Sequence, residues 1–224
     1  MRTVSTHRDL GVWTDCDPSP SRMCAESASR AGRMLNFVRR TFPRISPKIF
    51  HLLYPTYVRP FLEHCSIAWL PVLKRDKRVL EQVQRRATKL VAPIRSLLYP
   101  DRLKALNLVP LEYRRLRGCL IYTFKLFQGG AQGLHFSPAK WDFHGHARKV
   151  FIRRANTRLT LPVFSFVTTP LWNRLPPEVV FALSLPSFKS RLDKVLPSPL
   201  PSNSSLQPSP SPRYTAYPVA IPLV

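Results

Sequence analysis

Residues 76–90 have the sequence DKRVLEQVQRRATKL, which is the pattern of an amphipathic helix. Its apolar side chains recur at spacings of three and four residues and so share one helical face; they are Leu80, Val83, Ala87 and Leu90. Asp76 is placed to cap the first turn, and Glu81 and Arg85 are spaced to pair across one turn. The segment therefore predicts a helix with a buried stripe and a basic outer surface.

The chain before this segment predicts two more helices. Residues 25–42 repeat apolar side chains at the same helical spacing, and Pro43 ends that pattern because the residue before a proline disfavours helical backbone. Ser46-Pro47 then starts a helix, since a capping side chain is followed by proline in the first turn. Pro55 and Pro60 are expected to break or kink this second helix.

Three helices are expected after residue 90. A short one covers 101–106, and Pro110 opens a longer one that runs to 128, where Gly129-Gly130 ends it. The longer helix carries an apolar face made of Leu116, Leu120, Phe124 and Phe127. The last helix covers 186–195 and turns three apolar side chains inward, namely Phe188, Leu192 and Val195.

Three segments have other patterns. RDLGVW, at residues 8–13, predicts one strand, which needs a larger sheet to satisfy its backbone groups. VFIRRANTRLTLPVFSFV, at residues 150–167, alternates β-branched and aromatic residues and predicts one or two strands. Residues 197–224 hold 8 Pro and 6 Ser but no acid. Such a tail buries too little apolar surface to offset chain entropy, so it is expected to be disordered.

The charge of the chain is strongly basic. Its 224 residues include 35 Lys and Arg against 12 Asp and Glu, a formal net charge of +23. Residues 25–130 hold 21 Lys and Arg against 6 Asp and Glu, a net charge of +15. Like charges on one small domain repel, and a phosphate backbone would relieve that cost, whereas a neutral metabolic enzyme would not need them. The alternatives are solvated helix surfaces, a ribosomal-type protein or a spuriously translated reading frame.

Cysteine spacing and hydropathy bear on the compartment. Cys16, Cys24, Cys65 and Cys119 form no C-x-x-C ligand pair and no secreted disulfide framework, which indicates free thiols in a reducing compartment. The N-terminus lacks an apolar signal region, and no stretch approaches the ~20 apolar residues of a membrane helix. The expectation is an intracellular protein, in the nucleus or the cytoplasm, that does not span a membrane.

Several separate motifs occur in one order along the chain. The first is LLYPTYVRPFLEHCSIAWLPVLKRDKRVLEQVQRRATKLV, at residues 52–91. The second is RLKALNLVPLEYRRLRGCLIYTFKLFQG, at 102–129, and the third is PLWNRLPPEVVFALSLPSFKSRLDK, at 170–194. This order resembles the region after the palm subdomain in the reverse transcriptases of non-LTR, LINE-like retrotransposons of the Jockey type.

The resemblance implies a mainly α fold with four parts. Residues 1–24 would be the remnant of a palm-closing strand and loop, and 25–130 a basic, thumb-like bundle of helices. Residues 131–196 would form a C-terminal extension with short strands and a helix, in which α and β structure combine. The disordered Pro/Ser-rich tail, 197–224, would follow. Thumbs of this family lie along the template–primer duplex and grip its backbone.

Catalysis is not expected. Polymerases of this family hold two metal ions on an aromatic-x-Asp-Asp turn, and this chain has no Asp-Asp pair; Asp15-x-Asp17 is the nearest imitation. His144-x-His146 invites a metal site, but it would need two further ligands, such as Cys119 or Asp142. Solvent-exposed loop histidines are the preferred interpretation. No catalytic residue, metal or cofactor is therefore predicted.

The predicted site residues fall into two groups. The first group would contact phosphates without reading bases, and it comprises Arg39, Arg40, Arg59, Arg85, Arg86, Lys89, Arg114, Arg115 and Arg117. The second group would hold the fold, and it comprises Tyr54, Pro60, Glu63, Trp69, Trp172 and Phe188. Trp69 and Trp172 are expected to anchor two cores, although exposed tryptophans could instead stack on bases.

Three functional hypotheses follow. The first is a non-catalytic fragment of a reverse transcriptase that binds the backbone of DNA or RNA, as template–primer duplex or element RNA, without sequence preference. The second is an independent interaction module that recruits a protein partner through its Pro-rich tail. The third is a non-functional product of a decayed element.

Overall fold

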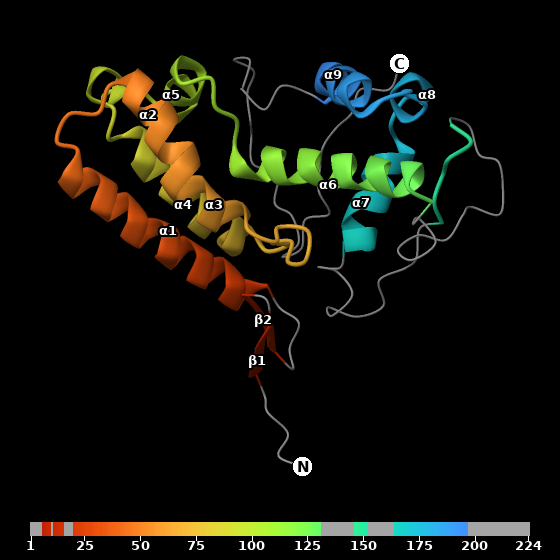
Figure 1. Cartoon of the computed structure of the whole chain (residues 1–224), viewed down its shortest axis with the longest axis horizontal. Coiled ribbons are helices and arrows are strands. Elements are labelled where there is room, and N and C mark those ends of the chain that lie inside the picture. The colour runs from red at the N-terminus through yellow and green to blue at the C-terminus, as the bar shows by residue number, and fades with distance from the viewer. Residues whose placement is uncertain (1–5, 10, 16–19, 131–145, 152–163, 197–224) are drawn as a thin grey trace, which may run out of the picture. The chain divides into compact units, whose positions relative to one another are not determined.

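The computed structural model describes residues 6–9, 11–15, 20–130, 146–151 and 164–196 (Figure 1). Within them the chain is mainly helical, which confirms the predicted fold class. The described residues form two compact units, one that ends at Arg115 and one that begins at Leu116. Among these residues, none of the helices combines the length and the apolar character that crossing a membrane requires.

The N-terminal unit is built on two long helices. Its elements are α1 (Ser21–Thr41), α2 (Pro47–Leu53), a π-helical turn (Tyr54–Val58), α3 (Arg59–Glu63), α4 (Lys74–Thr88), a 3-10 turn (Ala92–Ile94), α5 (Tyr99–Ala105) and the start of α6 (Leu111–Gln128). In Figure 1 α1 runs beside α4 and α3, and it packs on both. The contact is close because Ala31 on α1 and Ala87 on α4 are completely buried and small.

The stripe predicted on α4 is buried. Leu80, Val83 and Ala87 join one apolar core with the inner face of α1, and Leu90 packs on the edge of that core. The start signal at Ser46 is also confirmed, since the Ser46 hydroxyl accepts a hydrogen bond from the Ile49 amide at 3.3 Å. The backbone after it continues through Pro55 as a π-helical turn. Proline has no backbone N–H to donate, and the wider π-helical turn accommodates it within the helix. The distortion expected at Pro55 is therefore a π-helical turn.

Asp76 does not cap α4, contrary to prediction. The helix begins at Lys74, with Leu73 as its N-cap residue, so Asp76 lies inside the first turn. Its side chain is buried and accepts a hydrogen bond from the Ser21 hydroxyl at 2.7 Å. The carboxylate thus joins the start of α4 to the start of α1. Its partner is therefore a side chain 55 residues away, and not a backbone amide of its own helix.

The N-terminal segment forms a hairpin, and the prediction of a single strand is wrong. Strand β1 (Thr6–Asp9) pairs antiparallel with β2 (Val12–Asp15), and Arg8 lies opposite Trp13. Gly11 has a φ of +84°, which glycine adopts at little cost. RDLGVW therefore contains a chain reversal, because Gly11 supplies the left-handed backbone that a tight turn requires.

The C-terminal unit combines the rest of α6 with α7 (Phe164–Asn173), α8 (Pro177–Val180) and α9 (Leu185–Val195). Its centre is aromatic. Phe124 stacks on Phe188 with ring centroids 4.1 Å apart, and Phe127 stacks on Trp172 at 4.9 Å. The second small core expected around Trp172 and Phe188 is thus present, and it involves Leu175 as predicted. The predicted helix at 186–195 is confirmed.

Two expectations for this part of the chain are corrected. Residues 164–167 were predicted as strand but begin α7, while 152–163 lie outside the described residues. Helix wins because Phe164, Val167 and Leu171 then share a buried face. The thumb-like domain was also expected to reach residue 130, yet the first compact unit ends at Arg115. The apolar face of α6 belongs to the second core. The predicted tail, 197–224, lies outside the described residues.

Candidate nucleic-acid interface

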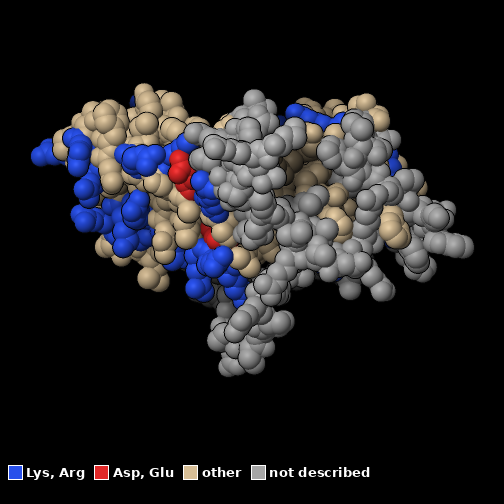
Figure 2. Space-filling view, turned by 90° about the horizontal axis from the view of Figure 1, so that it is seen from below, with Lys and Arg blue, Asp and Glu red and all other residues tan. Residues whose placement is uncertain are grey.

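Three carboxylates of the N-terminal unit form ion pairs within the unit. Glu26 pairs with Arg30 at 2.8 Å, Glu63 with Arg114 at 2.5 Å and Glu112 with Lys77 at 2.6 Å. Figure 2 looks at the molecule from the side on which α1 lies in Figure 1. Lys and Arg gather there toward the left, whereas Asp and Glu show as small patches. The internal pairs leave an excess of cations on the surface of this unit.

A groove of about 440 Å³ runs between α1 and α4. The α1 wall presents small side chains, which are Ala25, Ala28, Ser29 and Gly32. The α4 wall presents Val79, Gln82 and Val83, and two arginines, Arg33 and Arg86, border the groove. None of the described residues that line it is acidic. The floor of the groove is therefore uncharged, and an arginine borders it on each helix.

Gly32 shapes this groove. A Cβ atom added at Gly32 would lie 3.0 Å from the Nη2 atom of Arg86. Arg86 therefore reaches from α4 across the backbone of α1, and a larger residue at position 32 would push its guanidinium aside. In the sequence RAGR, at residues 30–33, Arg33 supplies one cation, and the missing side chain of Gly32 leaves space for a second cation, Arg86 of α4.

Further exposed cations lie on the same two helices, beyond the two arginines that border the groove. One of them, Arg75, also lies 3.6 Å from the Asp76 carboxylate and donates to the Ser21 hydroxyl at 3.3 Å. We name the following set the groove cations: Arg22, Arg33, Arg39 and Arg40 from α1, Arg75 and Arg86 from α4, and Lys89 just after α4. Arg22 and Arg33 are eleven residues apart, as are Arg75 and Arg86. Eleven residues make three helical turns, or about 16 Å, so each pair repeats on one side of its helix.

The predicted phosphate contacts divide between surface and interior. Arg39, Arg40, Arg86 and Lys89 are exposed and belong to the groove cations. Arg85 is also exposed, but it lines a separate pocket on a neighbouring side of α4, with its guanidinium 4.5 Å from the ring centroid of Tyr99.

Arg59 is half-buried, and its guanidinium lies 5.2 Å from the ring centroid of Tyr54. Its Nε atom has no hydrogen-bond partner among the described residues. Burial and the nearby Arg114 charge lower the pKa of Arg59. It lies apart from the described residues that line the groove.

Three predicted phosphate contacts have structural partners instead. Arg115 is 5% exposed, donates to the Leu62 carbonyl and lies 4.2 Å from the ring centroid of Trp69. Arg114 donates two hydrogen bonds to Glu63, at 2.5 and 3.2 Å. In the C-terminal unit, Arg117 donates two to Asp193, at 2.6 and 2.8 Å.

The burial of Arg115 excludes surface phosphate contact in this fold. The partners of Arg114 and Arg117 lie 51 and 76 residues away along the chain. The sequence pattern could not reveal them.

The structural residues behave as framework. Tyr54 is buried, which raises its pKa, and its hydroxyl donates to the Gln84 amide oxygen at 2.7 Å. The indole nitrogens of Trp69 and Trp172 donate to backbone carbonyls at 2.9 Å each. Both rings are buried and cannot stack on bases from this position. Pro60 is the exception, because it is exposed.

His146 is buried, and the expectation of a solvent-exposed histidine is wrong. Its Nε2 atom lies 3.0 Å from the Trp172 carbonyl oxygen, and burial lowers its pKa. His144 and Asp142 lie outside the described residues. Among the residues that are described, no group of three His, Cys, Asp or Glu side chains could hold a metal ion.

Sequence reasoning missed Arg22, Arg33, Arg75 and Gly32. The signal for the three arginines was present as an eleven-residue spacing off the apolar stripe of each helix, whereas no local signal marked Gly32. The chain matches no protein-family profile, no curated protein and no solved structure.

Proposed function

We propose that the N-terminal unit binds the sugar–phosphate backbone of DNA or RNA along the α1–α4 groove, without reading the base sequence. The observation that carries this proposal is a groove bordered by Arg33 and Arg86 and lined by no described acid. Small residues on its floor leave room for a strand, and guanidinium groups pair well with phosphate oxygens. Base specificity would need donors and acceptors aimed at base edges, and phosphate contacts alone carry no sequence information.

The energetics come from counterion release. Each phosphate that a cation neutralises contributes a slope of about −0.9 to log affinity against log salt on B-form DNA. If roughly five of the groove cations engage, the slope is about −4 to −5. Arg22 and Arg40 are 18 residues apart on α1, or about 27 Å along its axis. That length allows contact with several phosphates.

The decisive test compares two charge-matched triple variants. Arg33→Gln, Arg75→Gln and Arg86→Gln remove three of the groove cations, two of which border the groove itself, whereas Lys48→Gln, Arg95→Gln and Lys104→Gln remove three exposed cations outside that set. Binding to a 20-base-pair duplex is measured by fluorescence anisotropy from 50 to 300 mM salt.

The groove variant is expected to flatten the slope by about 2 to 3, with equal losses on different sequences. The control variant is expected to change the slope by less than about 1. Equal losses in both variants would mean that the charge acts diffusely, and the groove would not be the site.

The parent of such a chain is proposed to be the polymerase of a non-LTR retrotransposon, whose thumb holds template–primer duplex. Support comes from the order of the motifs at 52–91, 102–129 and 170–194. The chain would then bind without catalysing, because the aromatic-x-Asp-Asp turn of that family is missing from its sequence. Primed template, nucleotides and Mg²⁺ or Mn²⁺ provide the assay. Templated extension above that of a boiled sample would refute this part of the proposal.

A further inference from the structure

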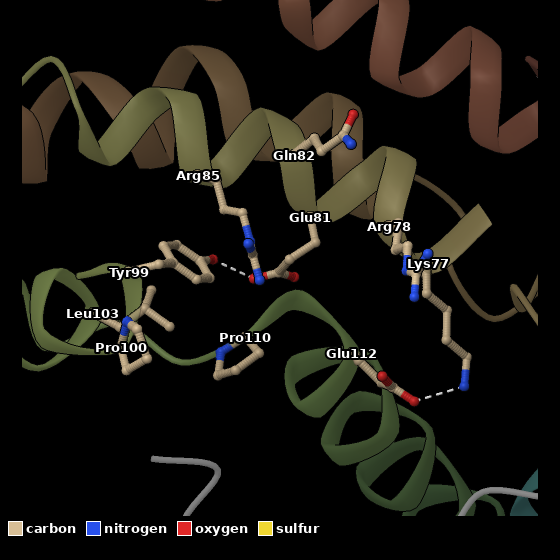
Figure 3. Close-up of a pocket in the computed structure, with 10 residues that line it drawn as sticks. All are labelled: Lys77, Arg78, Glu81, Gln82, Arg85, Tyr99, Pro100, Leu103, Pro110 and Glu112. Carbon is tan, nitrogen blue, oxygen red and sulfur yellow. Dashed lines mark hydrogen bonds and ion pairs between the residues drawn. The ribbon is translucent and has the colours of Figure 1, made fainter. Parts of the chain in front are cut away.

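A second concavity lies on a neighbouring side of α4. It has a volume of about 420 Å³ and is bordered by α4, by α5 and by the start of α6 (Figure 3). Gln82 lines both this pocket and the groove between α1 and α4. A strand that follows the groove would therefore pass within one helix width of the pocket.

Arg85 forms a flat platform inside this pocket. Figure 3 shows its side chain reaching from α4 toward α5, and the guanidinium lies 4.5 Å from the ring centroid of Tyr99. The Tyr99 hydroxyl donates to the Glu81 carboxylate and accepts a hydrogen bond from the Gln84 amide at 3.1 Å. Glu81 is itself held by the Leu111 amide at 2.9 Å. The ring beneath Arg85 is thus fixed from several sides, and the platform is preorganised.

The remaining walls suit a planar, partly apolar ligand. Pro100, Leu103 and Pro110 are apolar, and the exposed Gln82 offers an amide that can both donate and accept. Unpaired bases stack on arginine guanidinium planes as well as on aromatic rings. The volume lies at the lower end of the range for small-molecule sites, about 300 to 1,000 Å³, which fits a single nucleoside.

The charges of the pocket suit one phosphate at its edge. Arg78 is exposed at the rim, whereas Lys77 pairs with Glu112 at 2.6 Å. The Glu81 carboxylate is occupied by Tyr99 and by the Leu111 amide, so it does not face the ligand as an open anion. A base laid on Arg85 would leave its phosphate near Arg78 and the groove side of α4.

We infer that this pocket accepts the base of one unpaired nucleotide, with the base stacked on the guanidinium of Arg85. The inference rests on the proposed function, because the same strand would occupy the α1–α4 groove. It adds a preference for unpaired nucleotides over perfect duplex. Both a flipped-out base in a strand and a free nucleoside monophosphate carry the required chemistry.

The test uses two 20-base-pair duplexes that differ in one feature. One carries a single unpaired adenosine, and the other carries an abasic residue at the same place. The wild-type chain is expected to bind the first about tenfold more tightly at constant salt, the size of one base-stacking contact. Equal binding of both, with the steep salt slope intact, would overturn the pocket and leave the groove standing. A missing salt slope would refute the groove instead.

Two matched substitutions separate stacking from charge. Arg85→Lys keeps the charge but removes the flat guanidinium, so the tenfold preference is expected to vanish while the salt slope stays. Arg95→Lys makes the same chemical change at an exposed arginine that lines neither the pocket nor the groove, and it is expected to keep the preference. Both side chains are exposed, so both variants should fold, which circular dichroism checks. A preference that survives Arg85→Lys would overturn the inference.

Adenosine monophosphate distinguishes the two sources of the ligand. As a competitor it is expected to weaken binding of the adenosine-bulged duplex and to spare the abasic one, because only the first uses the pocket. If it displaces both duplexes equally, the competition is for phosphate alone, and the base pocket is refuted.

Discussion

Two arginine runs that look alike in the sequence have opposite roles in the fold. Arg85-Arg86 lies in α4, and Arg114-Arg115-Leu116-Arg117 lies at the start of α6. In α4 both guanidiniums remain at the surface, over Tyr99 and over Gly32. In α6 each arginine has a carboxylate, a carbonyl or a buried ring as its partner. The difference shows that a basic run leaves its cations at the surface only where the fold supplies no internal acceptor.

The helical position of Arg115 explains its fate. Leu111, Arg115 and Cys119 are spaced by four residues and are all buried, so the arginine occupies the apolar stripe of α6. Arg86 lies off the stripe that Leu80, Val83 and Ala87 form on α4. A buried guanidinium is costly without partners; here the Leu62 carbonyl accepts a hydrogen bond from Nη2 and the Trp69 ring lies against the guanidinium, while Nε and Nη1 have no hydrogen-bond partner among the described residues.

The largest effect on stability is expected when Arg115, the buried arginine of the α6 run, is replaced. Arg115→Ala leaves a cavity beside Trp69 and removes the donor to the Leu62 carbonyl, so the free energy of unfolding should fall by about 3 kcal/mol. The matched Arg86→Ala should cost less than about 0.5 kcal/mol, as exposed substitutions usually do. Urea unfolding followed by circular dichroism measures both. Similar losses in the two variants would contradict the division of roles.

Cys24 offers a second readout of the same variant. It is 1% exposed in the N-terminal unit, and burial raises the pKa of its thiol to about 12, so alkylation requires local opening. A loss of about 3 kcal/mol should speed that alkylation roughly a hundredfold at constant pH. Cys119 is equally buried in the C-terminal unit and reports on that unit. Its rate under the same conditions shows whether the damage stays local.

A smaller effect is expected for Arg114 and Glu63. Their side chains are about one-third exposed, and two hydrogen bonds hold them in one geometry. A double-mutant cycle with Arg114→Gln and Glu63→Gln should give a coupling of about 1 kcal/mol. A coupling near zero would return Arg114 to the candidates for phosphate contact.

The smallest effect is expected in the C-terminal unit. The Arg117–Asp193 pair is bidentate, but the Asp193 side chain is 48% exposed, so solvent screens it. Its coupling in a cycle with Arg117→Gln and Asp193→Asn should be about 0.5 kcal/mol or less, and should fade at 1 M salt. A salt-resistant coupling above about 1 kcal/mol would show that this pair holds the C-terminal core.

Local signals in the sequence determined most of the helices. The period of α4 and α6, the Ser46 cap and the Gly129-Gly130 stop depend on residues within one or two turns, so they were predictable. Exposure of Arg39, Arg40, Arg86 and Lys89 also followed from their place off the apolar stripes. The charge excess and the basic outer surface of α4 were likewise visible in the sequence.

Tertiary structure decided the rest, because the partners lie far apart along the chain. Asp76 accepts a hydrogen bond from Ser21, 55 residues away, instead of capping α4, and Arg114 pairs with Glu63, 51 residues away. The β-branched residues of α7 became helical because their helical face completes an aromatic core. The groove exists because Gly32 on one helix faces Arg86 on another. Pairings of this kind depend on how helices pack, which no local pattern encodes.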